Sequence, residues 1–202
     1  ALQDIPALAL QTELSGFEQP TSRALAIRGY YACISFTDSL IGQLLDELNR
    51  LDLWKTTLVV LLGDNGFHLG DHGGLWAKLS AFENSTRVPL ILAGAGVPTG
   101  RSITAPVELL DVYPTLADYA GFTAPAGLEG RSLRALIEGT DRGDQRVARS
   151  LVFHYDVTGK RDVPGRTVIS RNWRYTEWAE GSAGRELYLR SEDPHEIGRA
   201  HV

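Results

Sequence analysis

The run Leu58-Val59-Val60-Leu61-Leu62, closed by Gly63, constrains the fold more than any other feature of the sequence. A short, β-branched apolar run that ends at a glycine is typical of a strand buried on both faces of a parallel sheet. The segment Val88–Ala93, closed by Gly94, has the same character. We therefore expect two buried strands of a parallel sheet.

Helical patterns flank these strands. Apolar residues recur at steps of three, four and seven between Ser22 and Leu48, which predicts a long amphipathic helix with Thr21 or Ser22 as its N-cap. Further helices are expected at Ala77–Asn84, at Val107–Ala120 with a kink or restart at Pro114, and at Ser132–Glu138 with Gly139 as its end. The order helix, strand, loop, strand, helix favours an α/β fold with a doubly wound sheet.

The pattern changes near residue 145. Beyond a charged loop, short strand-like segments separated by turns predict a small antiparallel sheet. These segments are Ser150–Tyr155, Arg166–Arg171, Tyr175–Trp178 and Glu186–Leu189. We therefore divide the chain into an α/β part, residues 1–145, and a small C-terminal α+β subdomain, residues 146–202. Residues 1–22 are expected to be a linker.

Composition excludes several classes of protein. The 202 residues carry a net charge of −5, with 20 basic and 25 acidic side chains and no basic run, which argues against nucleic acid as a partner. The longest apolar stretch, Leu58–Leu62, is too short to span a membrane. The single cysteine, Cys33, excludes a disulfide framework and is expected to be a buried, inert thiol.

The chemistry of the sequence is concentrated between Gly63 and Lys78. Asp64 and Asn65 directly follow a predicted strand, at the edge where open α/β sheets bind ligands, and their oxygens suit Ca²⁺ or Mg²⁺. His68, His72 and Lys78 could add positive donors around an anionic ester. An Asp-Asn-Gly sequence alone is usually just a turn, so the surrounding residues carry this interpretation.

The Gly63–Lys78 loop and seven further short segments resemble the type I sulfatases of the alkaline-phosphatase superfamily, and most of all the iduronate-2-sulfatase-like branch. The resemblance covers about residues 24–196. The further segments are Tyr30–Asp38, Phe82–Ile91, Leu110–Leu116 with Leu128–Leu133, Arg174–Trp178, and Glu186–Tyr188 with Glu192–Glu196.

The resemblance implies hydrolysis of sulfate esters, with a divalent cation, usually Ca²⁺, and a formylglycine nucleophile made from a Cys/Ser-x-Pro-x-Arg motif. It implies that Asp64 and Asn65 ligate the metal and that Lys78 contacts the sulfate and the leaving-group oxygen. His72 is expected to line the pocket, and His68 is a weaker candidate because family members vary there. The implied substrate is a sulfated small molecule or glycan.

The sequence departs from the family pattern at its beginning. The nucleophile motif, a first pair of aspartates and a Lys and His pair, which precede this region in the family, do not occur, and Cys33 lacks the Pro and Arg of the motif. Together with the absence of methionine, this indicates the C-terminal part of a longer sulfatase. We predict that the 202 residues alone are inactive and expose apolar faces.

The other end also departs from the family pattern. The segment 197–202 can be back-translated into a sequence resembling a sequencing adapter, so we hypothesise that it is read-through. No function is assigned to His201.

Two alternatives remain open at this stage. A phosphonate or phosphate monoester hydrolase of the same superfamily would share the metal site, although Asn65 favours a sulfatase. A noncatalytic, sulfatase-like binding protein would keep the frame without the nucleophile. Several residues in the C-terminal segment could either touch a sulfated sugar or simply pack, and packing is favoured for Trp173. They are Arg171, Trp173, Arg174, Glu177 and Trp178.

Overall fold

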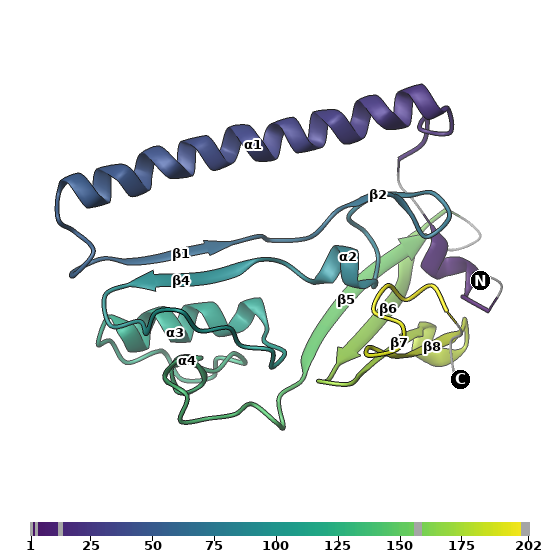
Figure 1. Ribbon diagram of the computed structural model, residues 1–202. Helices are drawn as coiled ribbons and strands as arrows, with labels where there is room; N and C mark the ends of the chain where they lie inside the picture. The colour runs from purple at the N-terminus through teal and green to yellow at the C-terminus, as the bar shows by residue number, and fades with distance from the viewer. Residues whose placement is uncertain (1, 3, 12–13, 156–158, 199–202) are drawn as a thin grey trace.

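The computed structural model describes residues 2, 4–11, 14–155 and 159–198, so that His201 and most of the hypothesised read-through segment lie outside it. Figure 1 shows how its elements are arranged. The helices are η1 (Ala7–Leu10), α1 (Pro20–Arg50), α2 (Glu83–Thr86), η2 (Leu109–Asp111), α3 (Val112–Tyr119), α4 (Arg134–Glu138) and η3 (Ala179–Gly181). The strands are β1 (Leu58–Leu62), β2 (His68–Asp71), β3 (Leu75–Ala77), β4 (Leu90–Gly94), β5 (Ala148–Tyr155), β6 (Arg161–Ile169), β7 (Trp173–Trp178) and β8 (Arg185–Leu189).

Helix α1 matches the predicted amphipathic helix but begins earlier than expected. Its first residue is Pro20, whose fixed φ suits the first helical position, and Gln19 takes the N-cap place of Thr21 or Ser22. None of its residues is buried: Ile27 and Ile41 of the apolar stripe are half-buried, whereas Tyr31 and Ile34 are exposed. Cys33 is exposed, so the expectation of a buried thiol was wrong.

Strands β1 and β4 pair with each other in an antiparallel register, with Val60 opposite Leu92. The expectation of buried parallel strands was wrong for this pair, and Leu61, Leu62 and Ile91 are exposed. An apolar, β-branched run specifies a strand, but its composition does not determine the direction of the neighbouring strand or the burial of its faces. Antiparallel strands do occur within otherwise parallel sheets.

The β1–β4 pair lies between helices, with α1 along one side and α3 and α4 on the other (Figure 1). The helix expected at Val107–Ala120 is divided into η2 and α3, and the restart falls at Val112, two residues before the expected Pro114. Helix α4 ends at Gly139 as expected, with a left-handed φ of 83°. Leu133, Leu136 and neighbouring apolar side chains form the core on this side.

The predicted C-terminal antiparallel sheet is confirmed, with strand order β5-β6-β7-β8. Its core side contains Trp178 and Tyr188, which are fully buried. Ile5 and Ala9 belong to the same core cluster, so residues 1–22 are not simply a linker: η1 packs against this core. The helix expected at Ala77–Asn84 is also corrected, because Ala77 ends β3 and α2 begins only at Glu83.

Among the described residues, no helix is both long enough and apolar enough to cross a membrane.

Candidate functional site

Strand β1 leads directly into Asp64 and Asn65, as the sequence predicted. The Asn65 N–H donates to Asp64 Oδ1 over 3.0 Å, which shapes a tight turn at the strand end. The following Gly66 donates its N–H to the Ser85 carbonyl over 2.9 Å. A Cβ at Gly66 would lie 1.9 Å from the Asn84 carbonyl oxygen, so only glycine allows the two segments to approach this closely.

A first prediction concerns this close approach. Replacing Gly66 with alanine is expected to lower the free energy of unfolding by about 1–3 kcal/mol, because the backbone of either segment must move. Gly42→Ala is the matched control, since Gly42 lies within α1 with open space around it. That substitution should raise the free energy of unfolding by up to about 1 kcal/mol. Urea denaturation of both variants tests these two predictions. Equal changes in the free energy of unfolding would contradict the steric argument for Gly66.

Lys78 follows β3 at a strained position. The preceding residue, Ala77, has a φ of 72°, a left-handed conformation that non-glycine residues rarely adopt. Lys78 itself is exposed, and no ion pair engages it within the described part of the chain. The strained residue, Ala77, therefore immediately precedes Lys78, whose ammonium group has no ion-pair partner among the described residues.

Asp64, Asn65 and Lys78 line one open cavity of about 1600 Å³. The structure thus brings together three of the four residues assigned to the site from the sequence. The same cavity is lined by many more basic than acidic side chains, in a chain whose net charge is −5. Its arginines are Arg87, Arg101, Arg149, Arg171, Arg174 and Arg190, and its further carboxylates are Glu83 and Glu108. This charge balance suits an anionic ligand.

The fourth residue, His72, lies elsewhere. Its side chain is buried, stacks on Phe82 with ring centroids 4.1 Å apart, and contacts Asp71 Oδ1 through Nδ1 over 3.0 Å. It does not line the cavity, so the expected position of His72 is corrected. A packed core on one side and a charged hydrogen-bond partner on the other hold the ring away from the cavity.

Asp71 connects His72 to His68. The same Asp71 oxygen accepts a hydrogen bond from His68 Nδ1, while His68 Nε2 contacts Ser80 Oγ over 2.7 Å. The Asn84 amide donates to the other Asp71 oxygen over 2.9 Å. His68, Asp71 and His72 are a candidate metal-binding group, with donor atoms within 4.8 Å of one another. Hydrogen bonds engage both His68 ring nitrogens and both Asp71 oxygens and link β2 to the turn that follows Lys78, whereas His72 Nε2 is buried without a hydrogen-bond partner.

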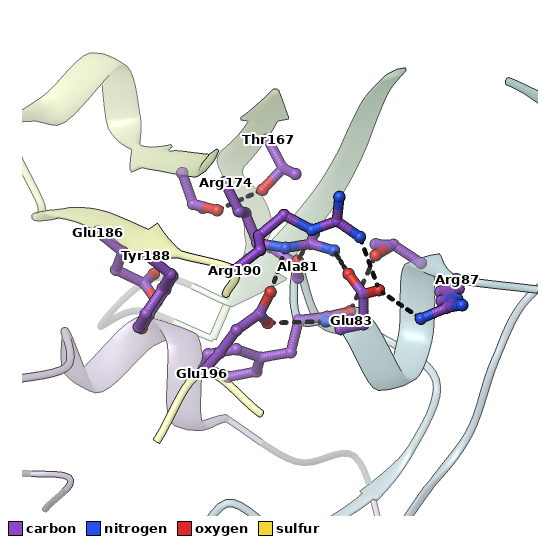
Figure 2. Close-up of polar contacts among 12 residues, drawn as sticks. Ala81, Glu83, Arg87, Thr167, Arg174, Glu186, Tyr188, Arg190 and Glu196 are labelled. Carbon is purple, nitrogen blue, oxygen red and sulfur yellow. Dashed lines mark hydrogen bonds and ion pairs between the residues drawn. The ribbon is translucent and has the colours of Figure 1, made fainter. Parts of the chain in front are cut away.

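A second buried group lies on the other side of that turn, and Figure 2 shows it. We call it the ion cluster: Glu83, Arg174, Arg190 and Glu196. Arg174 is 1% exposed and forms ion pairs with Glu83 and Glu196. The Glu83 N–H donates to Glu196 Oε2 over 2.8 Å, and Arg190 Nη2 donates to Glu83 Oε1 over 3.3 Å.

The pKa values of the two carboxylates of the ion cluster shift in opposite directions from their ordinary value. Burial alone would raise the pKa of Glu83, but the guanidinium groups of Arg174 and Arg190 outweigh it, so that the pKa lies below its ordinary value. Burial raises the pKa of Glu196 to about 7, with Arg174 opposing the shift. Glu83 is thus held ionised, while Glu196 gains its charge only near neutral pH.

A second prediction follows for the pH dependence of stability. The stability that Glu83 contributes is present above pH 4.5 and is lost as the pH falls below that value. The stability that Glu196 contributes is present below pH 4.5 and is lost as the pH rises toward 7. Stability should therefore decline from about pH 5 to pH 8, and Glu196→Gln should flatten this decline. Urea denaturation midpoints measured across this pH range test the prediction. An unchanged slope of midpoint against pH in Glu196→Gln would contradict the assignment of the decline to Glu196.

Arg174 was a candidate from the sequence without its partners, and Glu83 was missed as a functional candidate. The available signal was that Glu83, Arg174 and Glu196 each lie within a segment that resembles the family. Of the other C-terminal candidates, Arg171 lines the cavity, whereas Trp178 is fully buried and packs. Trp173 is 41% exposed, so packing does not account for it.

Comparison with known proteins places the chain in a family. The family model described as Sulfatase matches residues 9–122, and the one described as N-sulphoglucosamine sulphohydrolase, C-terminal, matches residues 70–201. The chain belongs to the sulfatase family.

Curated relatives agree with this assignment. The chain is 33% identical to a sulfatase of Formosa agariphila over 96% of its own length and 38% of the relative's length. It is 32% identical to human arylsulfatase K over 86% of its own length and 33% of the relative's length. The chain therefore spans 33–38% of the length of these two curated relatives.

Solved structures share its fold, which is that of the alkaline-phosphatase-like sulfatases. One neighbour, solved with its substrate D-glucosamine-2-N,6-O-disulfate, has a TM-score of 0.76 and 25% identity over 88% of this chain and 36% of its own. The phosphonate monoester hydrolase of Silicibacter pomeroyi has a TM-score of 0.69 and 23% identity, over 80% of this chain and 34% of its own. The second likeness is one of fold alone.

Proposed function

We propose that the protein to which this chain belongs hydrolyses sulfate esters, and that Asp64, Asn65 and Lys78 are residues of its active site. The observation that carries this proposal is that all three side chains line one cavity in a chain of the sulfatase family. The surplus of basic side chains around that cavity supports an anionic substrate.

Asp64 and Asn65 are proposed to hold a divalent cation, for which Ca²⁺ is the best candidate. The donor set fits such an ion: a carboxylate and an amide oxygen are hard ligands, and the Asp64 side chain is exposed at the end of β1. When bound, the cation would supply Lewis-acid polarisation of a sulfate oxygen. Two protein ligands are fewer than Ca²⁺ takes, so this proposal requires further oxygen ligands from outside Asp64 and Asn65.

Lys78 is proposed to bind the sulfate and to stabilise charge on the leaving-group oxygen. Its ammonium group is a compact cation, and no carboxylate neutralises it within the described residues. The strained turn at Ala77 fixes the origin of its side chain. A preorganised cation of this kind stabilises charge that develops during ester cleavage.

The nucleophile is proposed to come from outside these 202 residues. The sequence contains no Cys/Ser-x-Pro-x-Arg motif, and Cys33 lies exposed on α1. A sulfated carbohydrate is the proposed substrate, which agrees with the disulfated glucosamine bound by one structural neighbour. Assignment to the iduronate-2-sulfatase-like branch remains a prediction that depends on the Gly63–Lys78 loop.

The test is an assay of the protein encoded by the whole reading frame recovered from the source DNA. We expect hydrolysis of 4-nitrophenyl sulfate and of a sulfated monosaccharide, loss of activity with a chelator, and recovery when Ca²⁺ is added. Faster hydrolysis of the matching phosphate or phosphonate ester would favour the alternative hydrolase. Calcium binding without any hydrolysis would favour a noncatalytic protein and overturn the enzymatic proposal.

A further inference from the structure

The turn from Lys78 to Ser85 is held from two sides. On one side, Ser80 Oγ contacts His68 Nε2 over 2.7 Å and accepts the Phe82 N–H over 3.2 Å. On the other side, Arg174 Nη1 donates to the Ala81 carbonyl oxygen over 2.8 Å. The side chains of Ala81 and Phe82 are themselves buried. The backbone after Lys78 is therefore fixed by groups from β2 and β7.

The ion cluster joins segments that are far apart in the sequence. Arg174 comes from β7 and Glu83 begins α2, while Glu196 follows β8 near the end of the described chain. Arg174 reaches both carboxylates, and Glu196 also accepts the first N–H of α2 (Figure 2). One guanidinium thus binds the carbonyl of Ala81 and the side chain of Glu83 together.

The charges of the ion cluster are used within it. Two guanidinium groups face two carboxylates, and Arg190 also donates to the Ser170 and Arg171 carbonyl oxygens over 3.1 and 3.2 Å. Arg174 is too buried to serve as a freely moving cation for a ligand. The guanidinium groups of Arg174 and Arg190 are thus engaged by groups of the protein itself, so that the cluster contributes fixed geometry to the cavity wall.

A strained backbone needs such support. The left-handed conformation of Ala77 persists only where the surrounding structure determines it, and its cost is of the order of 1–3 kcal/mol. The first contact of the ion cluster with the turn lies four residues later, where Arg174 donates to the Ala81 carbonyl oxygen, and this contact restricts the alternative paths of the turn. Without it, the turn could relax and Lys78 would leave its place at the cavity.

We propose that Arg174, with Glu83 and Glu196, is a positioning group for Lys78: it anchors the C-terminal sheet to the Lys78–Ser85 turn and so sets where the Lys78 ammonium stands. The proposal rests on the function proposed above. It extends that function to a group in the C-terminal sheet that acts through Lys78 and not on the substrate itself.

The first experiment is hydrogen exchange on the whole protein encoded by the recovered reading frame, which requires no catalytic activity. In Arg174→Lys, one ammonium cannot satisfy the Ala81 carbonyl and both carboxylates at once. We expect the amides of residues 79–86 to exchange at least about tenfold faster, while β5 and β6 keep their protection. Arg166→Lys is the matched control, because Arg166 lies on β6 in an exposed ion pair with Glu180. Unchanged exchange at residues 79–86 would overturn the proposal.

The second experiment is a double-mutant cycle in the whole protein with 4-nitrophenyl sulfate. Arg174→Lys should lower kcat by about 10–100-fold with little change in KM, because a displaced catalytic group loses its alignment. In a Lys78→Ala background, Arg174→Lys should cause less than about a twofold further loss, since the two residues act as a unit. Additive losses would overturn the positioning role.

Different results would contradict the proposed function and the positioning role of Arg174. A whole protein that hydrolyses no sulfate ester would contradict the proposed function, whereas the exchange experiment would still decide whether Arg174 holds the turn. Both experiments use Arg174→Lys, which retains a cation beside the two buried carboxylates, so that neither experiment depends on a variant that leaves them unpaired.

Discussion

Replacing Lys78 with alanine is expected to lower kcat/KM for a sulfate ester by about 10²–10³-fold in the whole protein. This is the effect of removing one preorganised group that stabilises developing charge. The side chain is exposed, so the free energy of unfolding should change by less than about 0.5 kcal/mol. Steady-state kinetics and urea denaturation on the same preparation separate the two effects.

Lys55→Ala is the matched control for this prediction. Lys55 is also exposed, and it pairs with Asp52 at the surface and does not line the cavity. Its loss should leave kcat/KM unchanged. A loss below about tenfold in Lys78→Ala, or an equal loss in both variants, would remove Lys78 from the proposed site.

Replacing Trp178 with alanine is expected to lower the free energy of unfolding by about 3–5 kcal/mol, the largest effect on stability that we predict. Trp178 is 0% exposed, and its ring packs directly over Gly165 of the neighbouring strand. Its Nε1–H donates to Glu186 Oε1 over 2.6 Å. The substitution would leave a cavity and a buried carboxyl group without one of its donors.

Trp173→Ala, on the same strand β7, is the control. Trp173 is 41% exposed, so its removal should cost about 1 kcal/mol or less. Urea denaturation followed by far-ultraviolet circular dichroism compares the two variants. Similar losses would mean that Trp178 is not the centre of the core formed by η1 and the C-terminal sheet.

Several elements could be predicted from the sequence because their signals are local. The periodic stripe of α1, the glycine that ends α4 and the short strands of the C-terminal sheet each depend on neighbouring residues. The same holds for Asp64 and Asn65, which follow β1 directly. Lys78 was assigned a role only through the resemblance to the family, and in the structure it lines the same cavity as the other two.

Other features could not be predicted because they depend on packing between distant segments. The apolar run of β1 gave no information on its antiparallel partner, and the stripe of α1 did not reveal that Cys33 would be exposed. The position of Ile5 in the core depends on the C-terminal sheet, more than a hundred residues away. His72 matched the expected chemistry, yet Phe82 and Asp71 hold it outside the cavity.

The sequence alone determined the types of α1, β1, β4 and the C-terminal strands, the Asp64–Asn65 pair near a strand end and a lone lysine in the following segment. These properties are set by side-chain chemistry and by periods of two or 3.6 residues, which a linear chain displays directly. Only the tertiary structure decided which carboxylates form ion pairs with Arg174 and which histidines lie outside the cavity. Ion pairing and burial depend on distances of a few ångströms between segments far apart in the chain, and no local pattern encodes those distances.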